Sequence, residues 1–85
     1  MIVESIIGEI KKDLSASFIE FKGVYSRVID DRQAIEIHNC KGTNIFEFCN
    51  KICSQPIIKN YFEVDGEIQI KKFESIILFI KKDLL

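Results

Sequence analysis

Hydrophobic residues recur at helical spacing at both ends of the chain. Residues 4–14 and 74–84 are identical at nine of eleven positions. Each copy, together with the residue before it, carries apolar side chains at i, i+3, i+4, i+7 and i+11, the stripe of an amphipathic helix. The stripes are Val3, Ile6, Ile7, Ile10 and Leu14 in the first copy, and Phe73, Ile76, Ile77, Ile80 and Leu84 in the second. This pattern predicts helices over residues 2–14 and 73–84.

The two copies differ where Gly8 and Glu9 are replaced by Leu78 and Phe79. Both positions lie off the common stripe, so the second segment is apolar almost all round. A helix of that kind is buried or meets a second surface. We therefore expect the C-terminal helix to be central and the N-terminal helix to be peripheral.

The region between the terminal segments begins with the pattern of a β-hairpin. Residues 18–29 are β-branched and aromatic and roughly alternate, residues 30–32 are typical of a turn, and residues 33–39 alternate. The register stays open because the first strand offers apolar residues to both faces. In the second strand, Ile35 and Ile37 share one face, and Ala34, Glu36 and His38 share the other.

A middle helix is expected after this hairpin. Asn44 followed by Glu47 fits a capping box, which predicts a helix from residue 45 to about residue 54. Pro56 stops it. Its inner stripe is Ile45, Phe48, Cys49 and Ile52.

Residues 57–71 fit two structures. The apolar residues after Pro56 have helical spacing, whereas the alternation from residue 61 to residue 70 is typical of a hairpin. We favour the hairpin, with Phe62 opposite Ile68 across a turn at residues 64–66, and a short helical turn before it stays open. The predicted order is α-β-β-α-β-β-α. It describes one small α+β domain over residues 1–85, with antiparallel hairpins packed against amphipathic N- and C-terminal helices.

Composition and charge narrow the class of protein. Hydrophobic residues make up 47% of the chain and charged residues 29%, as in ordinary globular domains. The net charge is −1, which gives no field to attract nucleic acid or an anionic membrane. The N-terminus has no basic signal-peptide region, and no apolar run has membrane-spanning length. Three cysteines, an odd number, argue against a secreted disulfide framework, so we expect a cytoplasmic protein.

The only histidine and all three cysteines fall within residues 38–53. His38, Cys40, Cys49 and Cys53 have the chemistry of zinc ligands, but their spacing matches no zinc pattern. If the middle helix packs on the face of Ile35 and Ile37, the four side chains are kept apart. We therefore expect buried structural cysteines and no metal or other cofactor.

No catalytic motif is present in the chain. Asp30 and Asp31 fit a solvated turn pair better than an acid/base couple, and a Cys–His pair would have to use His38 with Cys49 or Cys53.

We therefore predict a non-enzymatic, small protein-interaction module of the inhibitor, immunity or adaptor type. Its partner is another protein or a second copy of itself in a homodimer. The predicted partner-binding residues are Leu78, Phe79 and Leu85, the apolar residues beyond the C-terminal stripe. The alternative is a metal- or nucleic-acid-binding regulatory protein.

Overall fold

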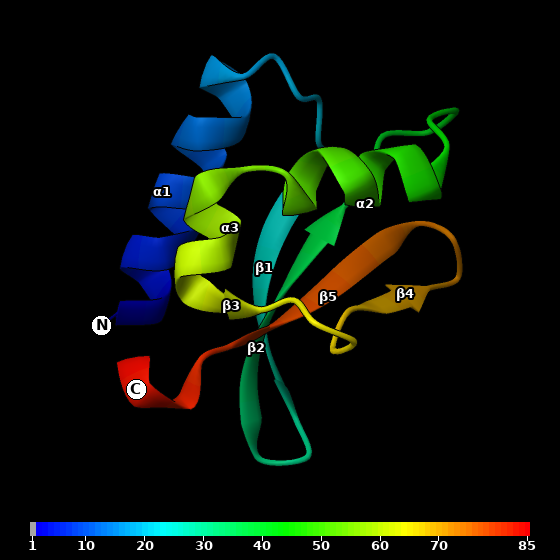
Figure 1. Ribbon diagram of the computed structural model, residues 1–85. Coiled ribbons are helices and arrows are strands. Elements are labelled where there is room, and N and C mark those ends of the chain that lie inside the picture. Colours follow the sequence, from blue (N-terminus) through cyan, green and yellow to red (C-terminus); the bar gives the residue numbers. More distant parts are fainter. Residues whose placement is uncertain (1) are drawn as a thin grey trace.

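A computed structural model describes residues 2–85, which form three α-helices on one face of an antiparallel sheet (Figure 1). The strands lie in the order β1-β2-β5-β3, and β4 also pairs with β5. The α+β class is confirmed, whereas the predicted element order differs from the observed one. The elements are α1 (Ile2–Ala16), β1 (Gly23–Ile29), β2 (Arg32–His38), α2 (Ile45–Cys53), α3 (Pro56–Tyr61), β3 (Phe62–Glu63), β4 (Gln69–Lys71), β5 (Ser75–Ile80) and the short 3₁₀ helix η1 (Lys82–Leu84).

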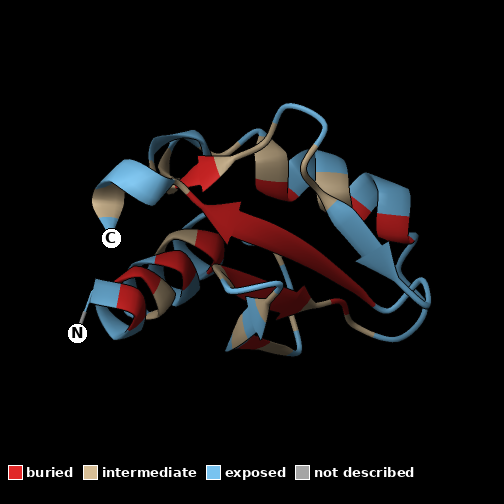
Figure 2. Ribbon diagram, turned by 90° about the horizontal axis from the view of Figure 1, so that it is seen from below, coloured by how far each residue is buried: buried red, intermediate tan, exposed pale blue. Residues whose placement is uncertain are grey.

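The predicted C-terminal helix is wrong, because this segment forms β5, a central strand between β2 and the pair β3 and β4. All six of its residues are buried, as Figure 2 shows. A continuous apolar run buried on both faces is typical of a central strand. Leu78 and Phe79 complete that run. The segment is therefore central, as expected, but it is a strand and not a helix.

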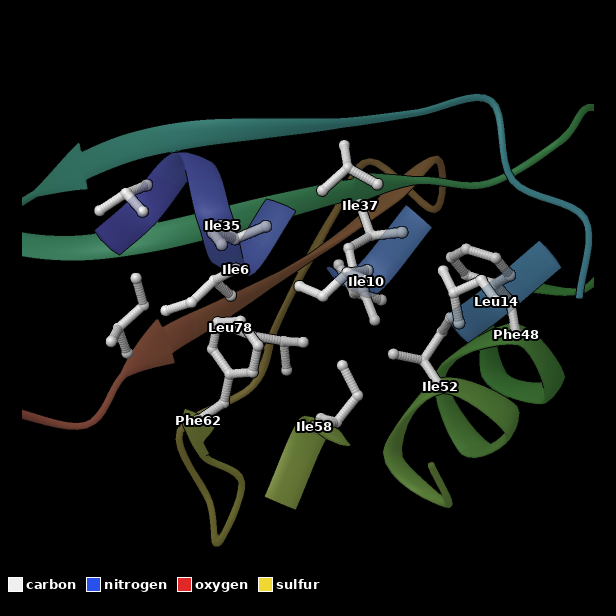
Figure 3. Packing of buried hydrophobic residues seen from close by; sticks show 14 of the residues in the cluster. Ile6, Ile10, Leu14, Ile35, Ile37, Phe48, Ile52, Ile58, Phe62 and Leu78 are labelled. Atoms are coloured by element: carbon white, nitrogen blue, oxygen red, sulfur yellow. The ribbon is translucent and has the colours of Figure 1, made fainter. Parts of the chain in front are cut away.

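The N-terminal copy is a helix, as predicted, and it ends two residues later than expected. Figure 3 shows its stripe in the core, where Ile6, Ile10 and Leu14 are fully buried. The helix closes with a Schellman motif, in which the Ile19 N–H donates to the Leu14 carbonyl at 2.9 Å. This motif turns the chain away, so the first strand begins at Gly23 and not at residue 18.

The predicted β1–β2 hairpin is confirmed, and its turn consists of Asp30 and Asp31. Both have positive φ, at 50° and 62°, as the two-residue turns that match strand twist require. This turn fixes the register, which runs from Ile29 opposite Arg32 to Gly23 opposite His38. The helix-side face of β2 carries Ile35 and Ile37, and the open face carries Ala34, Glu36 and His38.

The middle helix is confirmed, and the hairpin predicted after it is wrong. Asn44 caps α2, since its Oδ1 accepts from the N–H groups of Phe46 and Glu47 at 2.9 and 3.2 Å. Pro56 then starts the helix α3, where the helical spacing of the sequence left a short helical turn open. Both β3 and β4 pair with β5, so Phe62 lies opposite Ile80 and not Ile68. The predicted turn at residues 64–66 lies in the loop between β3 and β4. These two strands pair with different parts of the same edge of β5.

The main core lies between the helices and the sheet. Ile58 of α3 and Phe62 of β3 enter it together with the helix-side residues of β2 and β5 (Figure 3). The open face holds a smaller apolar cluster, formed by Ala34, Ile77 and Phe79.

Candidate functional site

The open face of the sheet is covered by side chains of its own strands. Phe79 is only 3% exposed, although no helix of residues 2–85 packs on this face. The Arg32 guanidinium lies 4.2 Å from the centre of the Phe79 ring, in cation–π contact. Arg32 also forms ion pairs with Glu63 at 2.6 Å and Glu67 at 3.0 Å. This half of the face is therefore closed by an ion-pair network.

The other half of the open face contains a polar cluster around Glu36, which is 3% exposed. Ser75 Oγ donates to Glu36 Oε2 at 2.7 Å, His38 Nε2 lies 2.8 Å from the same oxygen, and Arg27 pairs with Oε1. Burial alone would raise the pKa of Glu36, but hydrogen bonds from Ser75 and Arg27 and the charge of His38 hold this pKa below its ordinary value of 4.5. The cluster therefore keeps a buried carboxylate ionised.

The order of groups in the Glu36 cluster differs from that of a hydrolytic triad. In a triad the imidazole lies between the hydroxyl and the carboxylate and accepts the hydroxyl proton. Here Ser75 donates directly to Glu36 Oε2, and His38 Nε2 lies beside that oxygen and not between the hydroxyl and the carboxylate. A carboxylate with a lowered pKa is also a weak general base. The cluster is better suited to joining β1, β2 and β5 than to activating Ser75.

Tyr25 packs against this cluster at the end of β1. Its ring meets the His38 ring edge to face, with centroids 5.1 Å apart. The ring also folds over Gly23, where an added Cβ would lie 2.4 Å from the Tyr25 hydroxyl. Gly23 is thus needed for this packing. Strand alternation placed Glu36 and His38 on one face, but Ser75 was missed because its segment was assigned to a helix.

The four candidate zinc ligands do not come together in one site. His38 lies on the open face, whereas Cys49 and Cys53 lie on α2 across the sheet. No group of three or more His, Cys, Asp or Glu residues within residues 2–85 could hold a metal ion. The three cysteines are half-buried and not buried as expected. The thiols of Cys49 and Cys53 lie 4.0 Å apart, and burial together with Cys49 raises the pKa of Cys53 to about 12.

The prediction of Leu78, Phe79 and Leu85 as partner-binding residues requires Leu78 or Phe79 to be exposed, and neither is. Leu78 is fully buried in the core between helices and sheet, and Phe79 lies beneath Arg32. The reason is the strand geometry of β5, which directs successive side chains to opposite buried faces. Leu85, after η1, is 58% exposed.

Exposed aromatic residues gather instead around α2. Phe46 on α2 and Phe73 in the β4–β5 turn are 55% and 69% exposed, and their rings meet edge to face at 6.2 Å. Phe18, which is 93% exposed, lines a hollow with Asn50 and Lys51 of the same helix. Asn50 follows Phe46 by one helical turn, so it connects the Phe46–Phe73 pair with the hollow at Phe18. We call Phe18, Phe46, Asn50, Lys51 and Phe73 the α2 surface.

Two of these aromatic residues adopt a backbone conformation that favours glycine. Phe73 has φ 59° and follows Lys72 with φ 51°, in the three-residue loop between the paired residues Lys71 and Ser75. Two successive positive φ values are usually found at Asn-Gly. Phe18 has φ 57° at the position after α1 where helices commonly place glycine. Left-handed φ costs an L-residue about 1–2 kcal/mol. Both were missed in the sequence because Phe73 was assigned to a helix and Phe18 to a strand.

Comparison of the chain with known protein families, with curated proteins and with solved structures gives no match. Within the part of the chain that the structure describes, no helix is both long enough and apolar enough to cross a lipid bilayer.

Proposed function

We propose that this chain is a non-enzymatic, small protein-interaction module of the inhibitor, immunity or adaptor type, and that it binds another protein through the α2 surface. The observation that carries this proposal is the pair of exposed phenylalanines, Phe18 and Phe73, in left-handed backbone positions. Glycine would satisfy both positions at lower conformational cost. Backbone strain often clusters at binding sites, and the large exposed rings at these two positions support a contact outside the chain.

The size of the aromatic groups supports this assignment. A phenylalanine ring buries about 150–250 Å², so the exposed parts of Phe18, Phe46 and Phe73 would supply roughly 300–550 Å² to a contact. A standard protein interface covers about 800 Å² on each partner. The three rings would therefore provide about half of one side, with Asn50 and Lys51 as polar groups between them. Buried aromatic anchors among polar neighbours are typical of interface hot spots.

The cysteines support a reducing, cytoplasmic location as part of the same proposal. Cys40, Cys49 and Cys53 are all free in the structure. A secreted domain of this size would commonly use such residues in disulfides.

The proposal is tested by capture of binding proteins from the source organism on immobilised protein. The test variant combines Phe46→Ala with Phe73→Gly, which removes the stacked pair. The matched control is Ile2→Ala, which removes a 42% exposed apolar side chain from the start of α1, outside the α2 surface. A protein retained by wild type and by the control, and lost with the double variant, is the expected result. Equal retention by all three proteins would refute the assignment, and circular dichroism verifies that each variant is folded.

A further inference from the structure

The outer edge of β1 has no partner within the described chain, residues 2–85. β1 ends the strand order and pairs only with β2. The two-residue turn makes Ile29 and Arg32 the closing hydrogen-bonded pair, and hydrogen-bonded pairs alternate along an antiparallel ladder. The main-chain groups of Val24, Ser26 and Val28 therefore point away from β2. Such an edge is a template for another strand.

This edge also lacks the features that usually protect an edge strand. β1 contains no proline, and its one charged residue, Arg27, is already paired with Glu36. Ser26 is exposed on the helix side, so the helices leave room beside it. Tyr25 and Val28 are 54% and 68% exposed. Figure 1 shows the β1–β2 hairpin extending beyond the helices.

We infer that β1 pairs with β1 of a second copy of this chain, antiparallel, with the two-fold axis at Ser26. Ser26 then faces Ser26 of the second copy, Val24 faces its Val28, and Tyr25 faces its Arg27. All the outward main-chain groups of Val24, Ser26 and Val28 are satisfied, with about six hydrogen bonds in the two-fold pair. The two sheets become one continuous sheet.

The side chains favour this register and a second copy as the occupant. An axis at Arg27 would place two guanidinium groups opposite each other, and like charges in that position are destabilising. An axis at Tyr25 would form fewer hydrogen bonds, since Val28 would extend past the end of the partner strand. With the axis at Ser26, the exposed Val28 gains an apolar neighbour and the Tyr25 ring gains a cation. The same strand thus carries both members of each contact pair, so a second copy of the chain is a complementary partner. This inference is independent of the proposed function.

The register is tested by disulfide cross-linking of the full chain. The Cα atoms of a hydrogen-bonded antiparallel pair lie about 5.5 Å apart, within disulfide range. Ser26→Cys should therefore give a covalent dimer under mild oxidation. Val28→Cys is the control, because residue 28 of the two copies would lie about 14 Å apart along the strands. The wild type shows the background from its own cysteines.

Sedimentation equilibrium tests the dimer without cross-linking. Wild type should have twice the chain mass at high micromolar concentration, and Ser26→Glu, which places two carboxylates on the axis, should be a folded monomer. Wild type that stays monomeric would overturn the inference. So would equal cross-linking of Ser26→Cys and Val28→Cys, or a Ser26→Glu variant that remains dimeric.

Discussion

Exchange of the two positions that distinguish the twin segments should have opposite effects at the two ends of the chain. Leu78→Gly with Phe79→Glu makes residues 74–84 identical to residues 4–14. We expect this variant to be unfolded. Gly8→Leu with Glu9→Phe makes the reverse change, and we expect that variant to keep the fold.

The magnitudes follow from burial. Leu78 is fully buried and Phe79 is 3% exposed. Truncation of a buried leucine costs about 2–5 kcal/mol and loss of a buried phenylalanine about 3–5 kcal/mol, and glycine in a strand adds about 0.5–1 kcal/mol. The total of about 5–11 kcal/mol compares with a whole stability of about 4–13 kcal/mol for 85 residues. Coupling between adjacent positions changes this sum by about 0.5–3 kcal/mol, in either direction.

In the reverse exchange, the larger side chains on α1 have room around them. A Cβ added at Gly8 has no atom within 4 Å, and Glu9 is exposed. Leucine in place of glycine favours a helix by roughly 1 kcal/mol, and phenylalanine in place of glutamate costs less than that. Urea unfolding followed by circular dichroism measures both variants. A cooperative transition near the wild-type midpoint for the β5 variant, or loss of the transition for the α1 variant, would refute this explanation of the two structures.

Three further predictions concern single residues. Asn44→Ala should lower the free energy of unfolding by about 0.5–2 kcal/mol, since the α2 cap is lost, and an unchanged urea midpoint would contradict it. The free energy that ionised Glu36 contributes to folding is present above its unfolded pKa of about 4.5, and is lost as the pH falls through its lower folded pKa. The acid loss of stability in a urea titration series should therefore be smaller for Glu36→Gln than for wild type, and identical pH profiles would refute the role of the cluster. Cys53 should react with iodoacetamide at pH 8 more slowly than a free thiol, because its pKa is raised to about 12. Peptide mass spectrometry measures the labelling rate, and labelling of Cys53 as fast as that of a free thiol would contradict the prediction.

The sequence predicted those parts of the fold where local chemistry decides the structure. The Asn44 cap, the Asp30–Asp31 turn and the alternation of β2 each depend on residues close together in the chain. The C-terminal segment shows the limit of such reasoning. Its stripe has the same helical spacing as that of α1, and only its pairing with β2, β3 and β4 makes it a strand. Tertiary context overrides local pattern in such a segment.

The candidate site was less predictable than the fold. Period-two alternation placed Glu36 and His38 together, but Ser75 joins them from a strand that was assigned to a helix. Exposure of Leu78 and Phe79 was inferred from that same assignment and fails with it. Phe18 and Phe73 are exposed because turns hold them in left-handed conformations, a property that phenylalanine itself does not indicate.

The most direct test of a binding role for the α2 surface is the affinity of the captured partner for Lys72→Gly and Phe73→Gly, measured by titration calorimetry beside their unfolding free energies. Both changes relieve left-handed backbone in the same turn, but only the second removes the exposed ring. Lys72→Gly should bind like wild type. Phe73→Gly should bind at least tenfold more weakly while its unfolding free energy stays within about 1 kcal/mol of the wild-type value, since relief of strain offsets the lost stacking. Wild-type affinity in Phe73→Gly would contradict the proposed role of this surface.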